Sequence, residues 1–151
     1  LGPGKLVAGG GVAALGSLEV AAEKLGSRKQ RLAVTVAAHT PLMQDASGAF
    51  LTHLQSMQTP HAGVISGVSG EILRAQDGMR SQLARQISHT ILWDTCLQTC
   101  VEQGVEVVLE CGPGRALTRM LNERHPHIQA RAVDDFRAFP ALFAWVEHAL
   151  R

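Results

Sequence analysis

The sequence predicts an α/β protein in which strands pair mostly in parallel. Short runs rich in β-branched residues alternate with helical patterns along all 151 residues. The run 105–109 is continuously apolar, which is typical of a strand covered on both faces of a parallel sheet. Gly26 and Gly104 follow two of the helical patterns, where a glycine commonly ends a helix.

The first part of the chain is expected to form one β-α-β unit. Residues 5–8 form the first strand candidate, which ends at three consecutive glycines. A helix is expected over 17–25, capped by Ser17 and ended by Gly26. Its expected buried face consists of Leu18, Ala21, Ala22 and Leu25. Residues 31–38 follow as the second strand, because three consecutive β-branched residues lie at their centre.

A longer helix is expected to start at Thr40 and Pro41, with threonine as the cap and proline at the first helical position. Apolar residues recur every three or four positions and predict its buried face: Leu42, Ala46, Phe50, Leu54 and Met57. The pair Thr59-Pro60 is expected to end it. A strand at 63–65 and a glycine-containing turn follow.

Helices and strands continue to alternate to the end of the chain. Helices are expected over 78–87 and 91–103, and the apolar strand 105–109 follows the second of them. The apolar positions of the second helix are Trp93, Cys96, Leu97, Cys100 and Val101. The remaining elements are a helix over 116–123, a strand over 128–133 and a helix over 139–150 with Leu142, Val146 and Leu150 inward.

Composition and charge exclude several classes of partner. The chain is 46% hydrophobic, and its 14 basic and 13 acidic side chains give a net charge of +1. No basic run is longer than the pair Arg28-Lys29 with Arg31 nearby, so no nucleic-acid partner is expected. No apolar stretch is long enough to cross a bilayer, so no membrane association is expected. The odd number of cysteines, 3, fits a reducing compartment, so we expect a cytoplasmic location.

His39 is the most distinctive candidate for chemistry. It lies where the predicted strand 31–38 ends and the next helix begins. The carboxyl ends of strands in open α/β sheets are where ligands and reactive groups gather. An imidazole there can act as a general base near neutral pH. The alternative on spacing alone is a loop histidine that only makes local hydrogen bonds.

Three segments form a specific pattern in this order. Residues 36–43 read Val-Ala-Ala-His-Thr-Pro-Leu-Met, residues 83–87 read Leu-Ala-Arg-Gln-Ile with Trp93 six positions on, and residues 107–117 read Val-Val-Leu-Glu-Cys-Gly-Pro-Gly-Arg-Ala-Leu. Together they resemble motifs of the malonyl-CoA:acyl carrier protein transacylases and of the acyltransferase domains of polyketide synthases. Residues 130–137 look most similar to the C-terminus of the malonyltransferase (epsilon) subunit of malonate decarboxylase.

This resemblance implies a fold and an activity. Residues 1–38 would be the end of a small ferredoxin-like subdomain, and residues 39–151 the C-terminal part of an α/β hydrolase-like subdomain. The implied enzyme moves a malonyl or related acyl group from coenzyme A to the thiol of an acyl carrier protein, through a serine ester. It needs no cofactor and no metal, because the coenzyme A thioester is itself the substrate.

The resemblance also implies roles for four residues. His39 would be the catalytic base, and the backbone carbonyl of Gln86 would fix its tautomer. Val36 and Ala38 belong to the segment that lines the acyl pocket in the family, so they are expected to bind substrate. Ala38 is small where malonyl-selective members often carry phenylalanine, which leaves room for a bulkier α-substituent.

The sequence departs from the family in its nucleophile. A Gly-x-Ser-x-Gly elbow is expected upstream of the histidine, but the best match, Gly67-Val68-Ser69-Gly70-Glu71, lacks the last glycine and lies downstream. The oxyanion segment and the arginine that pairs with the malonyl carboxylate are missing too. Family members are considerably longer, so the chain is interpreted as a C-terminal half, with the N-terminal half of the same enzyme as a partner.

Two other functions remain open. The chain could be a non-catalytic α/β interaction module that keeps the acyltransferase fold. It could also bind a metal through Cys96, Cys100, Cys111 and His89. Both helical cysteines share an apolar face, which favours core packing over metal binding.

Overall fold

The computed structural model describes residues 6–58 and 60–151. The chain divides into two compact units, one spanning residues 7–99 and the other built on residues 100–151. Each unit is described by itself. The boundary expected between residues 38 and 39 does not coincide with this division and stays a prediction of the family resemblance.

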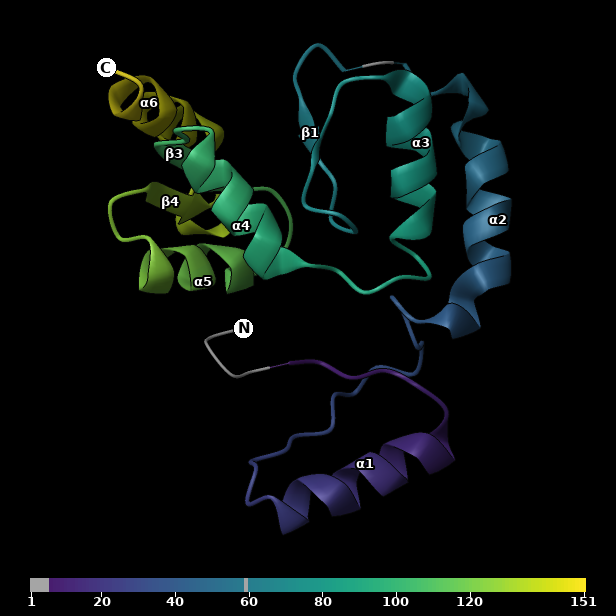
Figure 1. The fold of residues 1–151 in the computed structure, drawn as a ribbon. Helices are drawn as coiled ribbons and strands as arrows, with labels where there is room; N and C mark the ends of the chain where they lie inside the picture. The colour runs from purple at the N-terminus through teal and green to yellow at the C-terminus, as the bar shows by residue number, and fades with distance from the viewer. Residues whose placement is uncertain (1–5, 59) are drawn as a thin grey trace. The chain divides into compact units, whose positions relative to one another are not determined.

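The first unit is mainly helical (Figure 1). Its elements are α1 (Val12–Lys24), the short 3-10 helix η1 (Pro41–Met43), α2 (Gln44–His53), η2 (Leu54–Ser56), β1 (Val64–Ile65), β2 (Ile72–Leu73), α3 (Gln76–Arg85) and most of α4 (Trp93–Glu102). β1 and β2 form an antiparallel hairpin in which Val64 pairs with Leu73. α2 and α3 lie side by side, joined by a 2.7 Å hydrogen bond from the hydroxyl of Ser47 to the carbonyl of Ala84. Both of these residues are buried.

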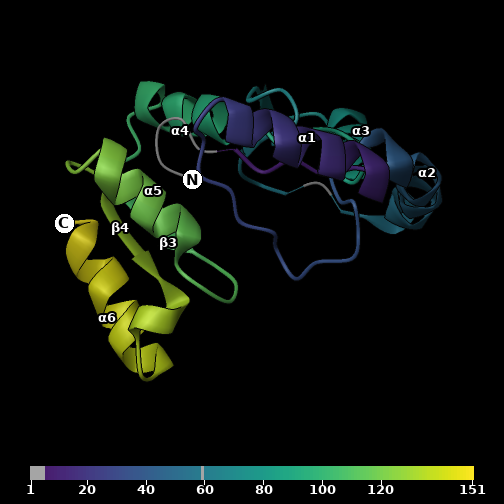
Figure 2. The same cartoon turned by 90° about the horizontal axis from the view of Figure 1, so that it is seen from below.

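The second unit is a β-α-β arrangement followed by a helix. It contains the end of α4, β3 (Val107–Glu110), α5 (Ala116–Arg124), β4 (Gln129–Ala132), η3 (Val133–Asp135) and α6 (Phe139–Ala149). β3 and β4 pair in parallel, with Val107 opposite Gln129 and Glu110 opposite Ala132. The two strands lie between α5 and α6 (Figures 1 and 2). Its buried residues include Met120, Leu121, Ile128, Ala130, Ala132 and Leu142.

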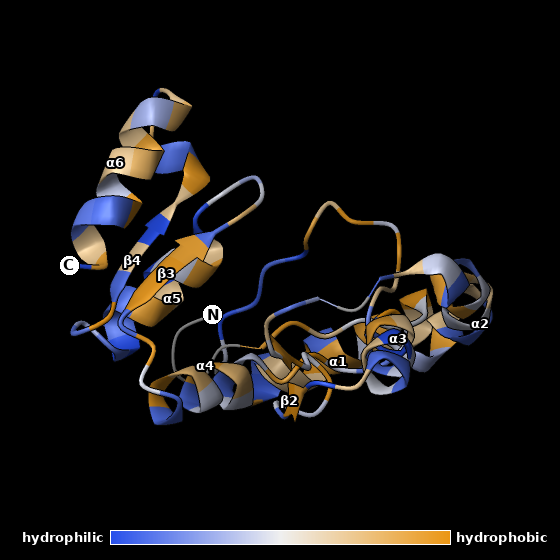
Figure 3. Ribbon diagram, turned by 90° about the horizontal axis from the view of Figure 1, so that it is seen from above, coloured by the Kyte–Doolittle hydropathy of each residue, from blue (hydrophilic) through white to orange (hydrophobic). Residues whose placement is uncertain are grey.

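The parallel pair confirms the predicted α/β class and the expected strand and helix order from residue 105 onward. β3 is hydrophobic along most of its length (Figure 3). Its four residues are nevertheless only half-buried, because the sheet that contains it has two strands. Leu142 is buried as expected and Val146 is half-buried, whereas Leu150 is 72% exposed. The inward position predicted for Leu150 is therefore wrong, since α6 ends at Ala149.

The predicted burial of α1 is wrong. The helix begins at Val12, and the Ser17 hydroxyl donates to the carbonyl of Ala13 at 3.2 Å inside the helix instead of capping it. Gly26 ends the helix as predicted, with a φ of +64°. No residue of α1 is buried, including the expected face Leu18, Ala21 and Ala22, and Leu25 beyond it is 81% exposed. The spacing identified an apolar face, but nothing in the spacing supplies an element to cover it.

The two strands predicted to flank α1 are also absent from the structure. Residues 6–8 and 31–38 are irregular, while Lys5 lies outside the described residues. A strand needs a partner for its backbone N–H and C=O groups, and no ladder joins these segments. Gly9, just after the first segment, does lie close to the end of the second, since an added Cβ would be 3.7 Å from the carbonyl oxygen of Ala38 and 3.9 Å from Cα of Ala37. A segment rich in β-branched residues therefore does not form a strand unless another strand pairs with it.

The middle elements agree better with prediction. α3, α4 and β1 lie within a few residues of their expected positions, and Pro41 is the first residue of η1. Thr40 is not a side-chain cap, because its hydroxyl donates backward to the carbonyl of Ala37 at 2.7 Å. The buried face predicted for 41–57 is wrong for its first part, whereas Leu54 and Met57 are half-buried. Its apolar residues Leu42 and Phe50 are 66% and 39% exposed, and the buried residue of α2 is Ser47.

Candidate active site around His39

His39 has an unusual backbone conformation. Its φ is +62°, and among the described residues it is the one non-glycine residue with a positive φ. For a residue with a Cβ, this left-handed region costs on the order of 1 kcal/mol or more. The conformation is held by a hydrogen bond from the His39 backbone N–H to the carbonyl of Ile87 at 2.9 Å. Strain of this kind gathers at functional sites, so the outlier supports a functional role.

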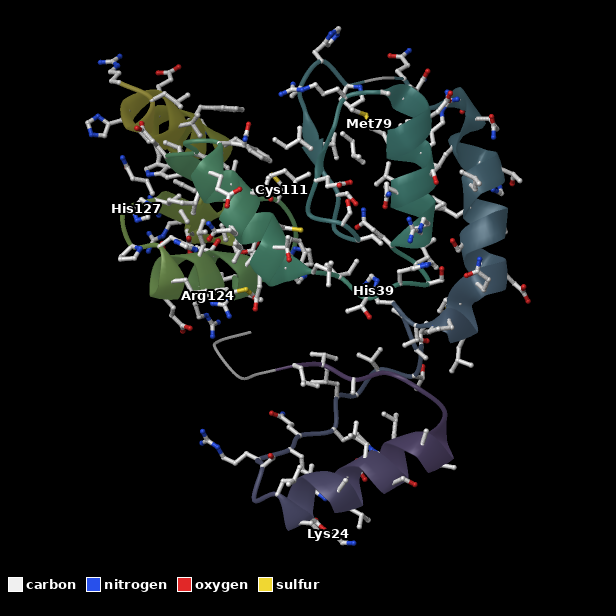
Figure 4. The ribbon with its side chains drawn as sticks, viewed as in Figure 1. Lys24, His39, Met79, Cys111, Arg124 and His127 are labelled. Carbon is white, nitrogen blue, oxygen red and sulfur yellow. The ribbon has the colours of Figure 1, made fainter. Side chains whose placement is uncertain are left out.

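The side chain of His39 is held by the neighbouring carbonyl. Its Nδ1 hydrogen-bonds to the backbone carbonyl of Gln86. A carbonyl can only accept, so in the neutral ring Nδ1 carries the proton and Nε2 keeps its lone pair. His39 is exposed, and it lies near the end of α3 beside the segment leading to α2 (Figure 4). The structure thus brings together the two residues that the resemblance paired.

The end of α3 explains why two carbonyls are available to His39. The last four carbonyls of a helix have no partner within it. Gln86 is the C-terminal cap of α3, and the carbonyls of Gln86 and Ile87 both accept from His39. The C-terminus of a helix carries partial negative charge, which stabilises a positively charged ring beside it. This place suits an imidazole that becomes positively charged during a reaction.

Val36 and Ala38 lie on the segment that leads into His39. Both are exposed, Val36 at 54%. The structure contains a pocket of about 170 Å³, but its lining comes from Val133, Phe136, Arg137, Ala138, Phe139 and Leu142. Neither Val36 nor Ala38 borders it, and their role in binding an acyl group stays a prediction.

The serine that best matched a nucleophile elbow is engaged in a turn. The Ser69 hydroxyl accepts from the backbone N–H of Glu71 at 3.3 Å. The neighbouring Ser66 is 1% exposed, and its hydroxyl accepts from the N–H groups of Val68 and Ser69 at 3.2 Å each. No serine hydroxyl of residues 6–58 and 60–151 is hydrogen-bonded to the ring of His39.

The burial and the neighbours of the three cysteines bear on the alternative that they bind a metal. Cys96 is buried, and its Sγ lies 3.4 Å from the carbonyl oxygen of Ser66. Cys100 is half-buried, and burial raises the pKa of its thiol. Cys111 is exposed. The described residues contain no group of three or more His, Cys, Asp or Glu side chains that could hold a metal ion.

The motif after β3 forms a strand-to-helix turn. Gly112 and Gly114 have φ values of +138° and +96°, which favour glycine. The carboxylate of Glu110 accepts from the backbone N–H groups of Leu117 at 3.2 Å and Thr118 at 2.8 Å. Burial raises the pKa of this carboxyl, but the N–H donors at the start of α5 outweigh it and leave the pKa below its usual value. Glu110 therefore caps α5.

Comparison with known proteins decides the relationship. No family model matches the sequence. A mitochondrial protein of Drosophila melanogaster, named as a probable malonyl-CoA-acyl carrier protein transacylase, is 38% identical over 124 residues, covering 78% of this chain and 33% of that protein. The malonyl-CoA-acyl carrier protein transacylase of Haemophilus influenzae is 28% identical over 143 residues, 93% of this chain and 46% of that enzyme. The chain is related to the malonyl-CoA:acyl carrier protein transacylases.

Solved transacylase structures agree with this relationship. The enzyme from Xanthomonas oryzae pv. oryzae superimposes with a TM-score of 0.74 at 28% identity, over 81% of this chain and 40% of that one. A malonyl-transacylase solved in complex with a type II polyketide synthase acyl-carrier protein gives 0.74 at 29% identity, over 83% and 41%. The chain thus spans between one third and one half of the length of these transacylases.

The sequence could not indicate some features of the site. The left-handed backbone of His39 was not predicted, although histidine is enriched among the few non-glycine residues that adopt a positive φ. The turn around Gly67 and Gly70 was expected, but its contact with Gln86 was not.

The described part of the chain also contains no helix long and apolar enough to cross a membrane.

Proposed function

We propose that this chain carries the general base of an enzyme similar to a malonyl-CoA:acyl carrier protein S-malonyltransferase. The main support is the geometry of His39, whose Nδ1 meets the Gln86 carbonyl while Nε2 remains available. In the first half-reaction, Nε2 takes the proton of a serine hydroxyl as the serine oxygen attacks the thioester carbonyl of malonyl-CoA. The ring then gives this proton to the departing thiolate of coenzyme A.

The second half-reaction reverses these proton transfers. The thiol of the acyl carrier protein loses its proton to Nε2 and attacks the serine ester. The carbon–oxygen bond breaks, and the serine oxygen recovers the proton from the ring. Gln86 orients the ring without adding a full charge, in the place that a carboxylate occupies in a triad. The carbonyl-rich end of α3 stabilises the imidazolium formed in each half.

The serine and the oxyanion donors come, in this proposal, from an N-terminal half with which the chain assembles. The chain spans 33% and 46% of two transacylases to which it is related. Several large apolar side chains lie exposed over residues 6–36, which is typical of a surface that another part of the protein covers. They are Leu6, Val7, Val12, Leu18, Val20, Leu25, Leu32, Val34 and Val36.

Finer features of the proposal come from the family resemblance. Residues 1–38 would complete a ferredoxin-like subdomain, and Val36 and Ala38 would border the acyl group. Residues 130–137 favour the malonyltransferase subunit of malonate decarboxylase as the nearest type. The proposed enzyme works in the cytoplasm and needs no cofactor, with the coenzyme A thioester as its substrate.

The deciding experiment measures malonyl transfer from malonyl-CoA to an acyl carrier protein by the complete enzyme, with the carrier followed by intact mass. His39→Ala should lower the rate at least about 10²-fold, the low end for a lost general base. His53→Ala is the matched control, since the ring of His53 is exposed and its Nδ1 lies 2.9 Å from the carbonyl oxygen of Ala49. If folded His39→Ala enzyme transfers at the unsubstituted rate, the chain is better described as a non-catalytic interaction module.

A further inference from the structure

The loop 66–70, which joins β1 to β2, is fastened to both neighbouring helices. The hydroxyl of Ser66 lies 3.3 Å from Oε1 of Gln82 on α3. The carbonyl of Gly67 accepts from the N–H of Leu92, just before α4, at 2.7 Å. The loop is therefore held at a fixed place beside the last turn of α3.

At Gly67 this loop comes very close to the side chain of Gln86. A Cβ added to Gly67 would lie 3.1 Å from Oε1 and 3.3 Å from Cδ of Gln86, and 3.4 Å from Cδ1 of Ile91. The first two distances are shorter than ordinary van der Waals contacts. The φ of Gly67 lies outside the left-handed region, so what glycine provides here is space, and a larger residue would push the Gln86 side chain by a few tenths of an ångström.

A displacement of Gln86 would directly change the hydrogen bonds of His39. Its carbonyl accepts from Nδ1 of His39, and the next carbonyl, that of Ile87, accepts from the His39 N–H. Gln86 caps the end of α3, and the peptide that carries its carbonyl is held there by a hydrogen bond from the Ile87 N–H to the carbonyl of Ala84 at 3.2 Å. At 3.2 Å this bond is a long one, so a push on the Gln86 side chain can shift the peptide and its carbonyl by a fraction of an ångström.

We propose that Gly67 is a positioning residue for His39. By leaving room for the Gln86 side chain, it keeps the Gln86 carbonyl at Nδ1 and thereby keeps the lone pair on Nε2. The proposal rests on the proposed role of His39 as the base. Gly67 itself touches neither substrate nor reacting atoms.

The first test determines the tautomer of the His39 ring by ¹⁵N NMR. It uses the 151-residue chain labelled with ¹⁵N-histidine, at a pH where the ring is neutral. The unsubstituted chain should show the Nδ1–H tautomer with a hydrogen-bonded proton. Gly67→Ala should shift the ring toward the Nε2–H tautomer, which free imidazole side chains prefer. Gly78→Ala is the matched control, since glycine 78 lies on α3 and an added Cβ meets nothing within 4 Å.

The second test measures kcat and KM for acyl transfer by the complete enzyme. Gly67→Ala should lower kcat about tenfold with KM nearly unchanged, since a displacement of about 1 Å can cost 10²-fold and the expected shift is smaller. In the Gln86→Ala background the same substitution should have little further effect, because the clashing atoms are gone. If Gly67→Ala unfolds the chain, adding Gln86→Ala should restore folding and the tautomer.

The possible outcomes separate this proposal from the proposed function. A folded Gly67→Ala chain with an unchanged His39 tautomer overturns the positioning role, as does a Gln86→Ala background that rescues nothing. A changed tautomer together with an unchanged transfer rate supports the positioning role but overturns the proposed base.

Discussion

The backbone carbonyl of Gln86 lies against Nδ1 of His39, although the two residues are 47 positions apart in the sequence. The adjacent carbonyl of Ile87 holds the His39 backbone at 2.9 Å. The two bonds fasten both the ring and the left-handed main chain of His39 to the end of α3. Because both acceptors are backbone atoms, the arrangement depends on the path of α3 more than on the side chains at its end.

This leads to a prediction for the Gln86 side chain. Gln86→Ala keeps the carbonyl and removes only the atoms that pack against Gly67. We expect kcat/KM of the complete enzyme to fall less than about tenfold, well short of the 10²-fold or more expected for His39→Ala. Steady-state transfer and thermal melts of both variants check this. Equal losses in two folded variants would mean that the amide group itself takes part in catalysis.

A second prediction concerns the bond that fixes α3 against α2. The buried hydroxyl of Ser47 donates to the carbonyl of Ala84 at 2.7 Å, two residues before Gln86. Ser47→Ala should lower the free energy of unfolding by about 1 kcal/mol, the usual loss for one such hydrogen bond. Urea unfolding measures this, with Ser81→Ala as a control because serine 81 is exposed on α3. A loss no greater than that of the control would show that the bond does not stabilise this helix pair.

The sequence predicted the second unit far better than the first, for a physical reason. β3, α5 and β4 are consecutive elements that bury one another, so local periodicity carries enough information to place them. α1 and the segments beside it have equally clear apolar patterns, but no residue of α1 is buried. Periodicity shows which face of an element is apolar and cannot show what covers that face.

The same distinction applies to the site. Composition and spacing placed His39 at the end of an apolar segment, and only the family resemblance paired it with Gln86. A contact across 47 positions has no local signal. The positive φ of His39 and the narrow space at Gly67 are consequences of tertiary packing, so they were visible only in the structure.

A third prediction follows from the lowered pKa of Glu110. Its carboxylate accepts from the N–H groups that start α5, so the ionised form is favoured in the folded chain. With a folded pKa below the unfolded value of about 4.3, its stabilisation is complete above that pH and disappears as the pH falls through the folded pKa. Glu110→Gln should therefore lower stability by about 0.5 kcal/mol at neutral pH and have little effect in acid.

Urea unfolding at pH 7 and at pH 3 tests this difference. Glu106→Gln is the control, because the side chain of glutamate 106 is exposed just before β3. A Glu110→Gln deficit that stays constant across this pH range would show that hydrogen bonding, and not charge, accounts for the capping.

A fourth prediction concerns the exposed apolar face of α1. Leu18 on α1 and Leu25, the residue that caps its C-terminus, are seven positions apart and are 47% and 81% exposed. If the nucleophile-bearing half covers them, the double variant Leu18→Ser/Leu25→Ser should bind that half at least about tenfold more weakly, since burying one leucine contributes about 1.5 kcal/mol or more. Titration calorimetry of the two halves measures the affinity, with Ala14→Ser as an exposed control on the same helix. Unchanged binding would place the interface elsewhere.

The last prediction separates the base from the nucleophile. Residues 1–151 by themselves should form no stable acyl adduct with malonyl-CoA. The best-matched serine, Ser69, is engaged in a turn, and no serine of the described segments bonds to the His39 ring. A base without an adjacent hydroxyl cannot generate the nucleophile, and triad enzymes that lose a member lose several orders of magnitude in rate.

Intact mass after incubation with malonyl-CoA should therefore show the unmodified 151-residue chain. Adding the nucleophile-bearing half should yield an adduct on that half alone, and the acyl carrier protein should then discharge it. In the presence of His39→Ala chain, both formation and discharge should slow, because one ring moves the proton in each half-reaction. An adduct mapped to any serine of this chain would show that the chain carries a nucleophile of its own. The proposal that the base and the nucleophile lie on different halves would then be wrong.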